Sequence, residues 1–271
     1  MSALPAYWQD KVALVTGGSS GLGLAIAESL ARRKAKVVIA ARRPEPLESA
    51  AAELRRYEPS AMAVPADVTR QEDVDRLIEE TIARFGKLDM LVNCAGRSTR
   101  GDILSTTAED FEQLLDLNFI ALVRCTLAAA PHLLQSKGHL VNIASLAAKS
   151  AGHHLGAYPA TKFAVAAYTQ QLRNELEPQG LHVLLVCPGP IAREEVRTYG
   201  AEQMPALPPR ASQPGGGVKL TRLSADKLAA AILKACERRK AELVMPAASR
   251  LLFALAQLSP RLGDWLLKKW S

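Results

Sequence analysis

The chain has 271 residues, of which 48% are hydrophobic and 23% are charged, an ordinary balance for a folded globular protein. This composition excludes a largely disordered chain and a protein with many membrane spans, since no apolar run approaches the ~20 residues that cross a bilayer. The net charge of +7 favours an anionic partner, which nucleic acid, a lipid surface or a phosphorylated ligand would all satisfy.

Short apolar or β-branched runs alternate with longer amphipathic segments along most of the chain. Apolar strands separated by helices are typical of a parallel sheet that is covered on both faces. The sequence therefore predicts an α/β fold, a single Rossmann-like doubly wound domain with about seven parallel strands. We expect strands at 12–17, 36–41, 62–67, 89–93, 139–145, 182–187 and 242–246, and helices near 22–33, 45–57, 71–85, 108–135, 158–177 and 225–238.

The first expected strand runs directly into TGGSSGLG, residues 16–23, and then into a helix. Gly17, Gly21 and Gly23 allow a tight turn and a close approach of backbone N–H groups to a pyrophosphate at the helix N-terminus. A glycine-rich loop is weak on its own, but its place between a first strand and a helix favours dinucleotide binding.

The second strand ends in KVVIAARR, so Ala41 stands where an NAD site normally has an acidic residue for the ribose 2′-hydroxyl. Arg42 and Arg43 follow it, and a guanidinium can bind a 2′-phosphate in a bidentate manner. The pattern favours NADP(H) over NAD(H), although two arginines in a solvated turn would look the same. Ser19 and Ser20 add hydroxyl donors to the glycine loop.

Helix starts are marked by Thr69, with Glu72 three residues later, and by Ser224. Farther along, Tyr158 and Lys162 lie one turn apart in YPATK, on one face of an expected helix. An ammonium beside a phenol stabilises the phenolate, and such a tyrosine can act as a general acid. Taken alone, this spacing is more often an ordinary amphipathic pattern.

Two regions depart from the alternation. Residues 192–223 form a long Pro- and Gly-rich stretch, a length typical of functional loops or disordered segments. Residues 248–271 form an apolar and basic C-terminal extension with tryptophans, typical of a helix at a membrane surface, of packing on the body or of contact with a second subunit. We therefore expect one domain over 1–247, with the loop 192–223 inside it, and a helical extension over 248–271; that the domain is catalytic and the loop its substrate loop is implied only by the family resemblance described below.

The N-terminus lacks the pattern of a secretory signal, which favours a cytoplasmic location. The cysteines are far apart and have no Cys-x-x-Cys pair, so we expect free thiols in a reducing compartment. The five histidines are scattered, and His153 and His154 have no ligand spacing around them, so the sequence predicts no metal site. The four cysteines are Cys94, Cys125, Cys187 and Cys236.

With TGGSSGLG, VNCAG, Asn118, Ser145 and YPATK in this order, the chain resembles the short-chain dehydrogenase/reductase family. The resemblance covers residues 10–190 closely and the remainder loosely. It implies that Tyr158 protonates a substrate carbonyl and that Lys162 tunes the tyrosine and bonds the nicotinamide ribose. Ser145 would polarise the carbonyl, and Asn118 would hold a proton-relay water.

The resemblance also implies the cofactor contacts. Asp67, with Val68 beside it, would lie at the adenine; Asn93, Ala95 and Gly96 would lie beside the adenosine ribose; and Pro188, Gly189 and Ile191 would lie beneath the nicotinamide. The full set of expected cofactor residues is Gly17, Ser19, Ser20, Gly21, Leu22, Gly23, Arg42, Arg43, Asp67, Val68, Asn93, Ala95, Gly96, Tyr158, Lys162, Pro188, Gly189 and Ile191.

Two positions depart from the family pattern. Cys94 replaces the second asparagine of Asn-Asn-Ala-Gly, so we expect one hydrogen bond between strands to be lost. Arg193 stands where many relatives have a threonine that bonds the carboxamide, so that contact is in doubt. Neither position belongs to the proton-transfer residues.

The leading interpretation is an NADP(H)-dependent oxidoreductase that interconverts a ketone or aldehyde and an alcohol, on a lipophilic substrate such as a steroid, retinoid or fatty-acyl derivative. A 3-oxoacyl-[acyl-carrier-protein] reductase would suit the +7 charge. A non-catalytic NADPH-binding scaffold or sensor is the third interpretation. Nucleic-acid binding is disfavoured because the arginines do not follow one aromatic-interleaved face. The resemblance implies a homodimer or homotetramer, paired through helices 108–135 and 158–177.

Overall fold

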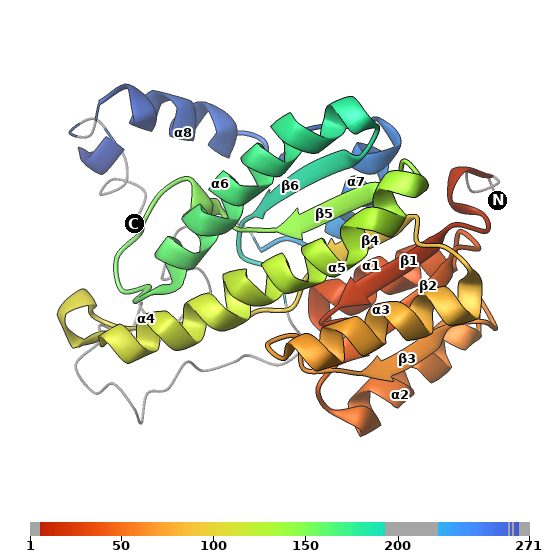
Figure 1. Ribbon diagram of the computed structural model, residues 1–271. Helices are drawn as coiled ribbons and strands as arrows, with labels where there is room; N and C mark the ends of the chain where they lie inside the picture. Colours follow the sequence, from red (N-terminus) through yellow and green to blue (C-terminus); the bar gives the residue numbers. More distant parts are fainter. Residues whose placement is uncertain (1–5, 193–221, 260, 262, 266–271) are drawn as a thin grey trace.

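The computed structural model describes residues 6–192, 222–259, 261 and 263–265. Its centre is a sheet of seven parallel strands in the order β3-β2-β1-β4-β5-β6-β7, which confirms the predicted fold class (Figure 1). The strands are β1 (Val12–Thr16), β2 (Lys36–Ala41), β3 (Met62–Pro65), β4 (Met90–Asn93), β5 (His139–Ile143), β6 (His182–Pro188) and β7 (Glu242–Met245).

Helices cover both faces of the sheet, as the unbroken burial of β1, β4 and β6 requires. Side chains of α1, α2 and α7 share one core cluster with the sheet, those of α3 and α5 share a second, and Val165 of α6 belongs to a third, smaller one. Figure 1 shows α3, α5 and α6 in front of the strands. The helix bounds are α1 (Gly21–Ala31), α2 (Pro44–Arg55), α3 (Gln71–Phe85), α4 (Ala108–Leu115), α5 (Ala121–Gln135), α6 (Tyr158–Leu176), α7 (Ala225–Glu237) and α8 (Ser249–Leu258).

The strand order reverses between β1 and β4. The chain winds outward from β1 through β2 to β3 and then returns to place β4 on the other side of β1. Ligands of open α/β sheets bind at such a point, outside the carboxyl ends of the strands. In Figure 1 the strands run toward the left, so the residues that follow each strand gather at that edge.

The segment 108–135 is one continuous helical path with an irregular centre. It begins as α4, widens into a π-helical turn at η3 (Asp116–Ile120) and continues as α5. Its length and composition alone would allow it to cross a membrane. In the fold, however, Cys125, Ala129 and Leu133 are buried against the sheet, as in the core helix of a packed domain.

Helix beginnings agree only partly with the predicted caps. Ser224 accepts a hydrogen bond from the Lys227 N–H at 3.4 Å and caps α7 as expected. The Thr69 cap is wrong: α3 begins at Gln71 after Arg70, and the Thr69 hydroxyl donates to Asp67 at 2.8 Å instead. The Thr69 hydroxyl therefore bonds to a carboxylate two residues away and does not cap the helix.

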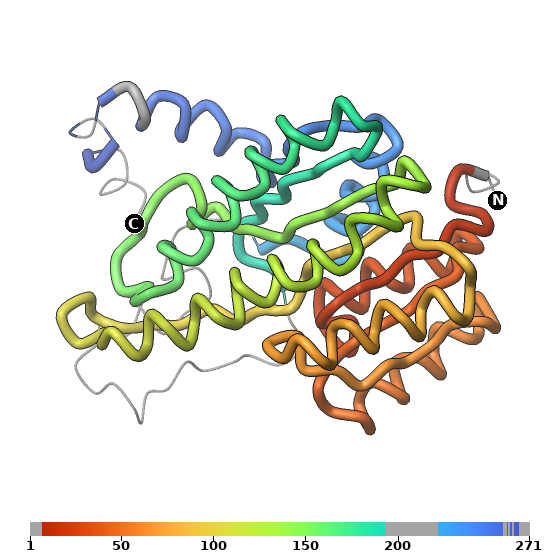
Figure 2. Tube along the Cα trace, viewed as in Figure 1, coloured from red at the N-terminus to blue at the C-terminus, as the bar shows by residue number. Residues whose placement is uncertain are grey.

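Short 3-10 segments complete the described chain: η1 (Ala6–Trp8), η2 (Ile103–Ser105), η4 (Leu146–Ala148) and η5 (Glu177–Gln179). Figure 2 shows the loop before α4 and the loop before α6 meeting beyond the carboxyl ends of the strands, where Gly101 and Leu155 form a bridge. Most of the expected substrate loop, including Arg193, lies outside the described residues.

Candidate active site

Tyr158 and Lys162 occupy the first turns of α6, which begins beside the carboxyl end of β5. The Lys162 Nζ atom lies 5.8 Å from the centre of the Tyr158 ring. It donates a hydrogen bond of 2.9 Å to the carbonyl oxygen of Ile143, the last residue of β5. The helix therefore carries both side chains to the strand end on one face, as their spacing predicts.

Lys162 is 6% exposed, and this burial lowers the pKa of its ammonium from 10.5 to about 8. The interior disfavours the charged form because it cannot replace water around the ammonium. A lysine with this pKa exchanges a proton more readily near neutral pH than a lysine in water. Tyr158 is half-buried, so it is partly accessible to solvent.

Asn118 fastens the loop after β4 to α6. Its side-chain oxygen accepts from the Arg97 N–H at 2.9 Å, and its amide nitrogen donates to the Arg97 carbonyl at 2.8 Å and to the Thr161 hydroxyl at 3.1 Å. A Cβ at Gly96, where φ is +155°, would lie 2.8 Å from that same oxygen. The loop can therefore approach Asn118 only with glycine at position 96.

Ser145 follows β5 and begins the short segment η4. Its Oγ accepts a hydrogen bond of 3.1 Å from the Ala147 N–H. Because that bond uses an oxygen lone pair, the hydroxyl hydrogen is left to donate elsewhere. Ser145 is half-buried and comes two residues after Ile143, whose carbonyl holds Lys162. The catalytic residues expected from the sequence thus meet at the ends of β4 and β5.

The glycine loop after β1 is closely packed against its surroundings. A Cβ at Gly23 would lie 2.3 Å from the Gly17 carbonyl oxygen, and one at Gly17 would lie 3.0 Å from the backbone of Ala95. Gly17 has φ of +67° and Gly21 has φ of +56°, both in the left-handed region that favours glycine. A Cβ at Gly21 would meet nothing within 4 Å, so this side of the loop is open.

The start of α1 offers backbone N–H groups at that open side. Ser20 occupies the N-cap position in an extended conformation and makes no side-chain capping bond. The first N–H groups of a helix have no intrahelical partner, and they suit a phosphate. Leu22 is buried in the core and can contribute only its backbone, whereas Ser19 is half-buried in the loop. The residues therefore fit a dinucleotide pyrophosphate.

Residues at the next strand ends extend the same edge. Arg42 and Arg43 are exposed after β2, and neither has an ion-pair partner among the residues that the structure describes. Asp67 accepts from the Thr69 N–H at 3.1 Å and the Thr69 hydroxyl at 2.8 Å, which fixes its carboxylate after β3. Val68 is buried beside the same edge.

Pro188 is buried at the end of β6, and the next residue, Gly189, donates from its N–H to the Met245 carbonyl at 2.7 Å. Ile191 pairs with Leu223, which brings together the two ends of the loop between β6 and α7. This segment lies next to η4, since a Cβ at Gly189 would be 3.4 Å from the Leu146 side chain. The predicted residues of β1, β4, β5 and β6 therefore share one edge of the sheet.

The side chain of Asn93 points into the fold, so only its backbone faces the place expected for the ribose. Its amide nitrogen donates to the Thr126 hydroxyl at 3.1 Å and to Asn142 Oδ1 at 2.9 Å, inside the sheet. Its side chain is only 4% exposed, so it joins β4 to β5 and α5 and holds the following loop from below. Val68 and Ala95 line one narrow pocket with it.

Sequence reasoning missed two hydroxyls that position the site. Thr16 Oγ1 accepts from the N–H groups of Cys94 and Ala95 at 3.1 and 3.2 Å, which fixes the loop after β4. Thr161 donates to the Tyr158 carbonyl at 2.8 Å and accepts from Asn118. Their positions in the sequence could have indicated this role, because Thr16 ends the first strand and Thr161 lies between Tyr158 and Lys162.

Comparison with known proteins agrees with this geometry. The family described as short chain dehydrogenase matches residues 11–203 of the chain. An uncharacterized oxidoreductase of Staphylococcus aureus (strain MRSA252) is 37% identical over 202 residues, which are 74% of this chain and 87% of that protein.

Two solved structures share the fold. The L-sorbose reductase of Gluconobacter frateurii, complexed with NADPH and L-sorbose, has a TM-score of 0.78 and 26% identity, covering 89% of this chain and 97% of that one. A short-chain dehydrogenase/reductase of Burkholderia phymatum, in complex with NAD, has a TM-score of 0.81 and 26% identity, and the match covers 94% of this chain and 96% of that one. Similar chains thus occur with either nicotinamide dinucleotide.

Proposed function

The chain belongs to the short-chain dehydrogenase family of oxidoreductases, and on that premise we propose that it interconverts a ketone or aldehyde and an alcohol with NADP(H). One observation carries the proposal. The buried Lys162 lies one helical turn from Tyr158 and is bonded to the end of β5, the strand that Ser145 follows. An acid, the cation that would tune it and a hydroxyl donor therefore belong to the carboxyl end of β5 and the first turns of α6, next to β4.

The side chains divide the chemistry among them. A nicotinamide cofactor supplies or accepts the hydride when bound. As negative charge grows on the carbonyl oxygen, Tyr158 gives it a proton and Ser145 donates a second hydrogen bond. Lys162 stabilises the phenolate that remains, and Asn118 holds the loop and helix in register. In the oxidative direction Tyr158 takes the proton back.

The preference for NADP(H) rests on Arg42 and Arg43. Ala41 brings no carboxylate to repel a 2′-phosphate, and the exposed guanidiniums that follow it are charged donors of the kind a phosphate binds. Arg42→Ala should weaken NADPH binding by roughly 10- to 100-fold and scarcely change NADH binding. Arg84→Ala, an exposed arginine at the end of α3, is the control. Equal losses for both cofactors, measured by fluorescence titration, would contradict the preference.

For the substrate we propose a lipophilic carbonyl or alcohol. Ile103 and Leu104 are 62% and 95% exposed in η2, in the loop between β4 and α4. Such side chains suit a substrate with apolar surface, such as a steroid, retinoid or fatty-acyl derivative. A 3-oxoacyl group on an acidic carrier protein is the second enzymatic candidate, favoured by the net charge of +7.

The test measures NADPH oxidation with a panel of steroid, retinal, long-chain and 3-oxoacyl carbonyls. The reaction is monitored by the loss of absorbance of the reduced nicotinamide. Tyr158→Phe should lower the rate with the best substrate by roughly 10²- to 10⁴-fold, the range of general acid catalysis. Tyr168→Phe alters another half-buried tyrosine of the same helix and should retain the rate. Full activity in Tyr158→Phe would refute the mechanism, and tight NADPH binding with no turnover on any carbonyl would favour the scaffold or sensor.

We further propose that 1–247 is the catalytic unit, with a cytoplasmic location, and that 248–271 reaches a membrane surface. In α8, Phe253 is buried while Leu251 is 68% exposed, and Trp265 beyond the helix is 57% exposed. Full-length protein should co-sediment with anionic vesicles and a chain ending at Ala247 should not. If both remain in the supernatant, the extension has another role.

We also propose a homodimer or homotetramer that pairs through α5 and α6. Leu127 is 63% exposed on α5 and Phe163 is 44% exposed on α6, so both helices present apolar side chains on the outer side of the layer. An interface core of this kind is typically apolar with a polar rim.

A further inference from the structure

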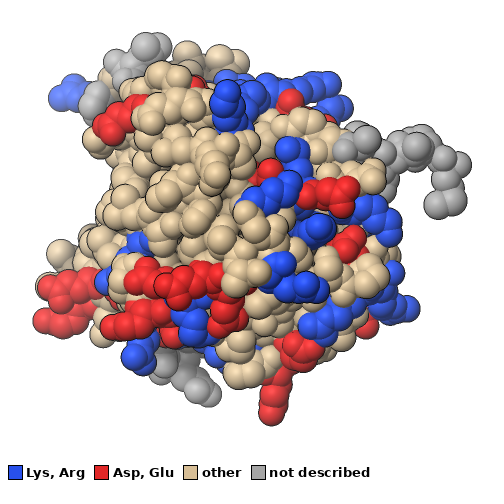
Figure 3. All heavy atoms as spheres, turned by 45° about the vertical axis from the view of Figure 1, so that its right-hand side comes forward, with Lys and Arg blue, Asp and Glu red and all other residues tan. Residues whose placement is uncertain are grey.

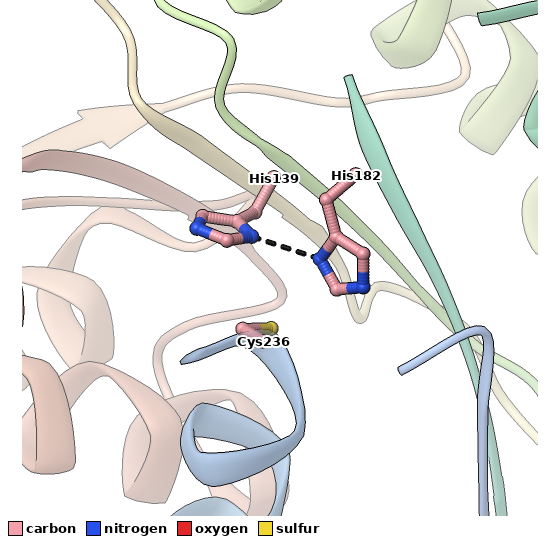
Figure 4. A group of neighbouring side chains, drawn as sticks. All are labelled: His139, His182 and Cys236. Carbon is pink, nitrogen blue, oxygen red and sulfur yellow. Dashed lines mark hydrogen bonds between the residues drawn. The ribbon is translucent and has the colours of Figure 1, made fainter. Parts of the chain in front are cut away.

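A second group of chemically capable side chains lies at the opposite edge of the sheet. His139 is the first residue of β5 and His182 is the first residue of β6, and the parallel register pairs them directly. Cys236, in the last turn of α7, lies close to both rings (Figure 4). These residues are at the amino ends of the strands, whereas Ser145 and Lys162 act at the carboxyl ends.

The three potential ligand residues converge. The Nδ1 atoms of His139 and His182 are 2.8 Å apart, and one ring nitrogen of each histidine and Cys236 Sγ all lie within 4.8 Å of one another. Two imidazole nitrogens on a tetrahedral zinc ion, each at ~2.0–2.1 Å, are roughly 3.3 Å apart, and a thiolate sulfur at ~2.3 Å is roughly 3.6 Å from each. To admit the ion, the two Nδ1 atoms need to separate by about half an ångström, and the Cys236 side chain needs to place its sulfur roughly 3.6 Å from each of them.

Hydrogen bonds to the Nε2 atoms of both rings can leave the Nδ1 atoms available as metal ligands. His182 Nε2 lies 2.8 Å from the Lys240 carbonyl, which can only accept, so Nε2 carries the proton and the Nδ1 lone pair faces His139. His139 then donates from Nδ1, and its Nε2 lies 2.8 Å from the Tyr7 hydroxyl. A hydroxyl both donates and accepts, so the His139 proton can move to Nε2 and free the second Nδ1 lone pair.

The surroundings exclude water from the three ligands. His139 is 1% exposed, and His182, Cys236 and the overlying Trp8 are 0% exposed. The Trp8 ring lies 5.5 Å from the His139 ring, and its Nε1 donates to Glu237 Oε1 at 2.7 Å. Glu237 follows Cys236 in the chain and supplies a negative charge beside the ligands. Two neutral imidazoles, one thiolate and a nearby carboxylate suit a divalent ion of borderline softness.

We propose that His139 Nδ1, His182 Nδ1 and Cys236 Sγ bind one zinc-class divalent ion at the amino ends of β5 and β6. Binding breaks the Cys236 S–H bond, releases that proton to solvent and forms the metal–sulfur bond, with no change of oxidation state. The ion joins two strands and α7, and Tyr7 and Trp8 of η1 close over it. Its role is structural, since the substrate edge is at the other end of the strands.

The first test uses Co²⁺ as a spectroscopic probe of the full-length protein, after treatment with chelator and reductant. Wild type should bind one Co²⁺ with a sulfur-to-cobalt charge-transfer band that Zn²⁺ abolishes by displacement. Cys236→Ser should lose this band. Cys125→Ser is the matched control, because Cys125 is also buried, at 2% exposure, but belongs to no such cluster among the described residues. The neighbouring pair His153, which is exposed, and His154, which is half-buried, contains no thiol and cannot produce the band.

The second test requires no variant and so does not depend on the fold of Cys236→Ser. Zn²⁺ at about 100 times its dissociation constant should raise the wild-type Tm by roughly 5 °C, while Mg²⁺ should not. Absence of both the band and the Tm shift in wild type would overturn the proposal. So would an equal band in Cys236→Ser, because the sulfur ligand would then be another cysteine.

Discussion

Lys162 is the residue in which stability and function conflict most clearly. Its ammonium is buried at the end of β5, and burial lowers its pKa to about 8. Below pH 8 the lysine is charged in both the folded and the unfolded state, so folding carries the full cost of desolvation. Between pH 8 and 10.5 the unfolded chain holds a proton that the folded chain has lost, and this cost decreases as the pH rises.

Lys162→Met should therefore abolish carbonyl reduction and yet raise the free energy of unfolding by about 1–3 kcal/mol at pH 7. At pH 9 the difference in free energy of unfolding between Lys162→Met and wild type should be smaller by about 1 kcal/mol, because Lys162 of the folded wild type is then mostly neutral. Urea titrations at the two pH values measure both effects. Lys227→Met, at an exposed position of α7, should change stability by less than about 0.5 kcal/mol. Lower stability of Lys162→Met at pH 7 would mean that the bond to Ile143 outweighs the desolvation.

The helical path 108–135 shows how an irregular element can serve a site. Its π-helical turn contains Asn118, which is 1% exposed and bonded to both the Arg97 backbone and Thr161. Single π-helical turns inside α-helices are rare and occur often at functional sites. Here the turn belongs to the helix that covers the sheet, and its buried amide joins the loop after β4 to α6.

Asn118→Leu should weaken this junction and lower the free energy of unfolding by about 2–4 kcal/mol, because it leaves the partly buried backbone N–H and carbonyl of Arg97 and the buried Thr161 hydroxyl without these partners. Thr161→Val removes one of the three Asn118 bonds, together with the bond from the Thr161 hydroxyl to the Tyr158 carbonyl, and should cost about 1–2 kcal/mol. Hydrogen exchange gives the specific readout, since the Arg97 amide donates to Asn118 and should exchange faster in Asn118→Leu. Unchanged protection of that amide would show that the loop is held by other contacts.

At the scale of the whole molecule, the charged side chains are unevenly distributed over the surface (Figure 3). Figure 3 shows side chains of both signs over much of one side and a broad, largely uncharged area at the left of the view, above a group of acidic side chains. Leu127 and Phe163 are exposed on α5 and α6, which form part of the front layer in Figure 1. Exposed apolar side chains on neighbouring helices are typical of an interface between subunits.

The double variant Leu127→Glu, Phe163→Glu should shift the protein toward the monomer, because buried, unpaired carboxylates oppose association. Sedimentation velocity measures the change over a concentration series. Leu104→Glu is the control, since Leu104 is 95% exposed but lies in η2, away from both helices. A wild type that sediments as a monomer at all concentrations would contradict the proposed oligomer.

The sequence by itself determined the elements and their order. Apolar runs alternating with amphipathic segments predicted all seven strands and the helices from α1 to α7, because burial on both faces leaves a pattern that each strand carries alone. Tyr158 and Lys162 were also legible, since their spacing within one helix fixes their common face. The π-helical turn could not be predicted from the sequence, because LDLNFI contains no glycine or proline that would mark a break in the α-helix.

Only the tertiary structure decided which distant residues meet. Asn93 faces Asn142 and not the open edge because β4 and β5 pair in that register, and Thr16 holds the next loop because β1 lies beside β4. The histidines looked scattered, and the sequence predicted no metal site. Their positions in the chain contain no ligand spacing, but the parallel register of β5 and β6 places His139 beside His182, and α7 brings Cys236 over both. Local patterns record what a segment buries, whereas contacts between segments depend on how the sheet is ordered.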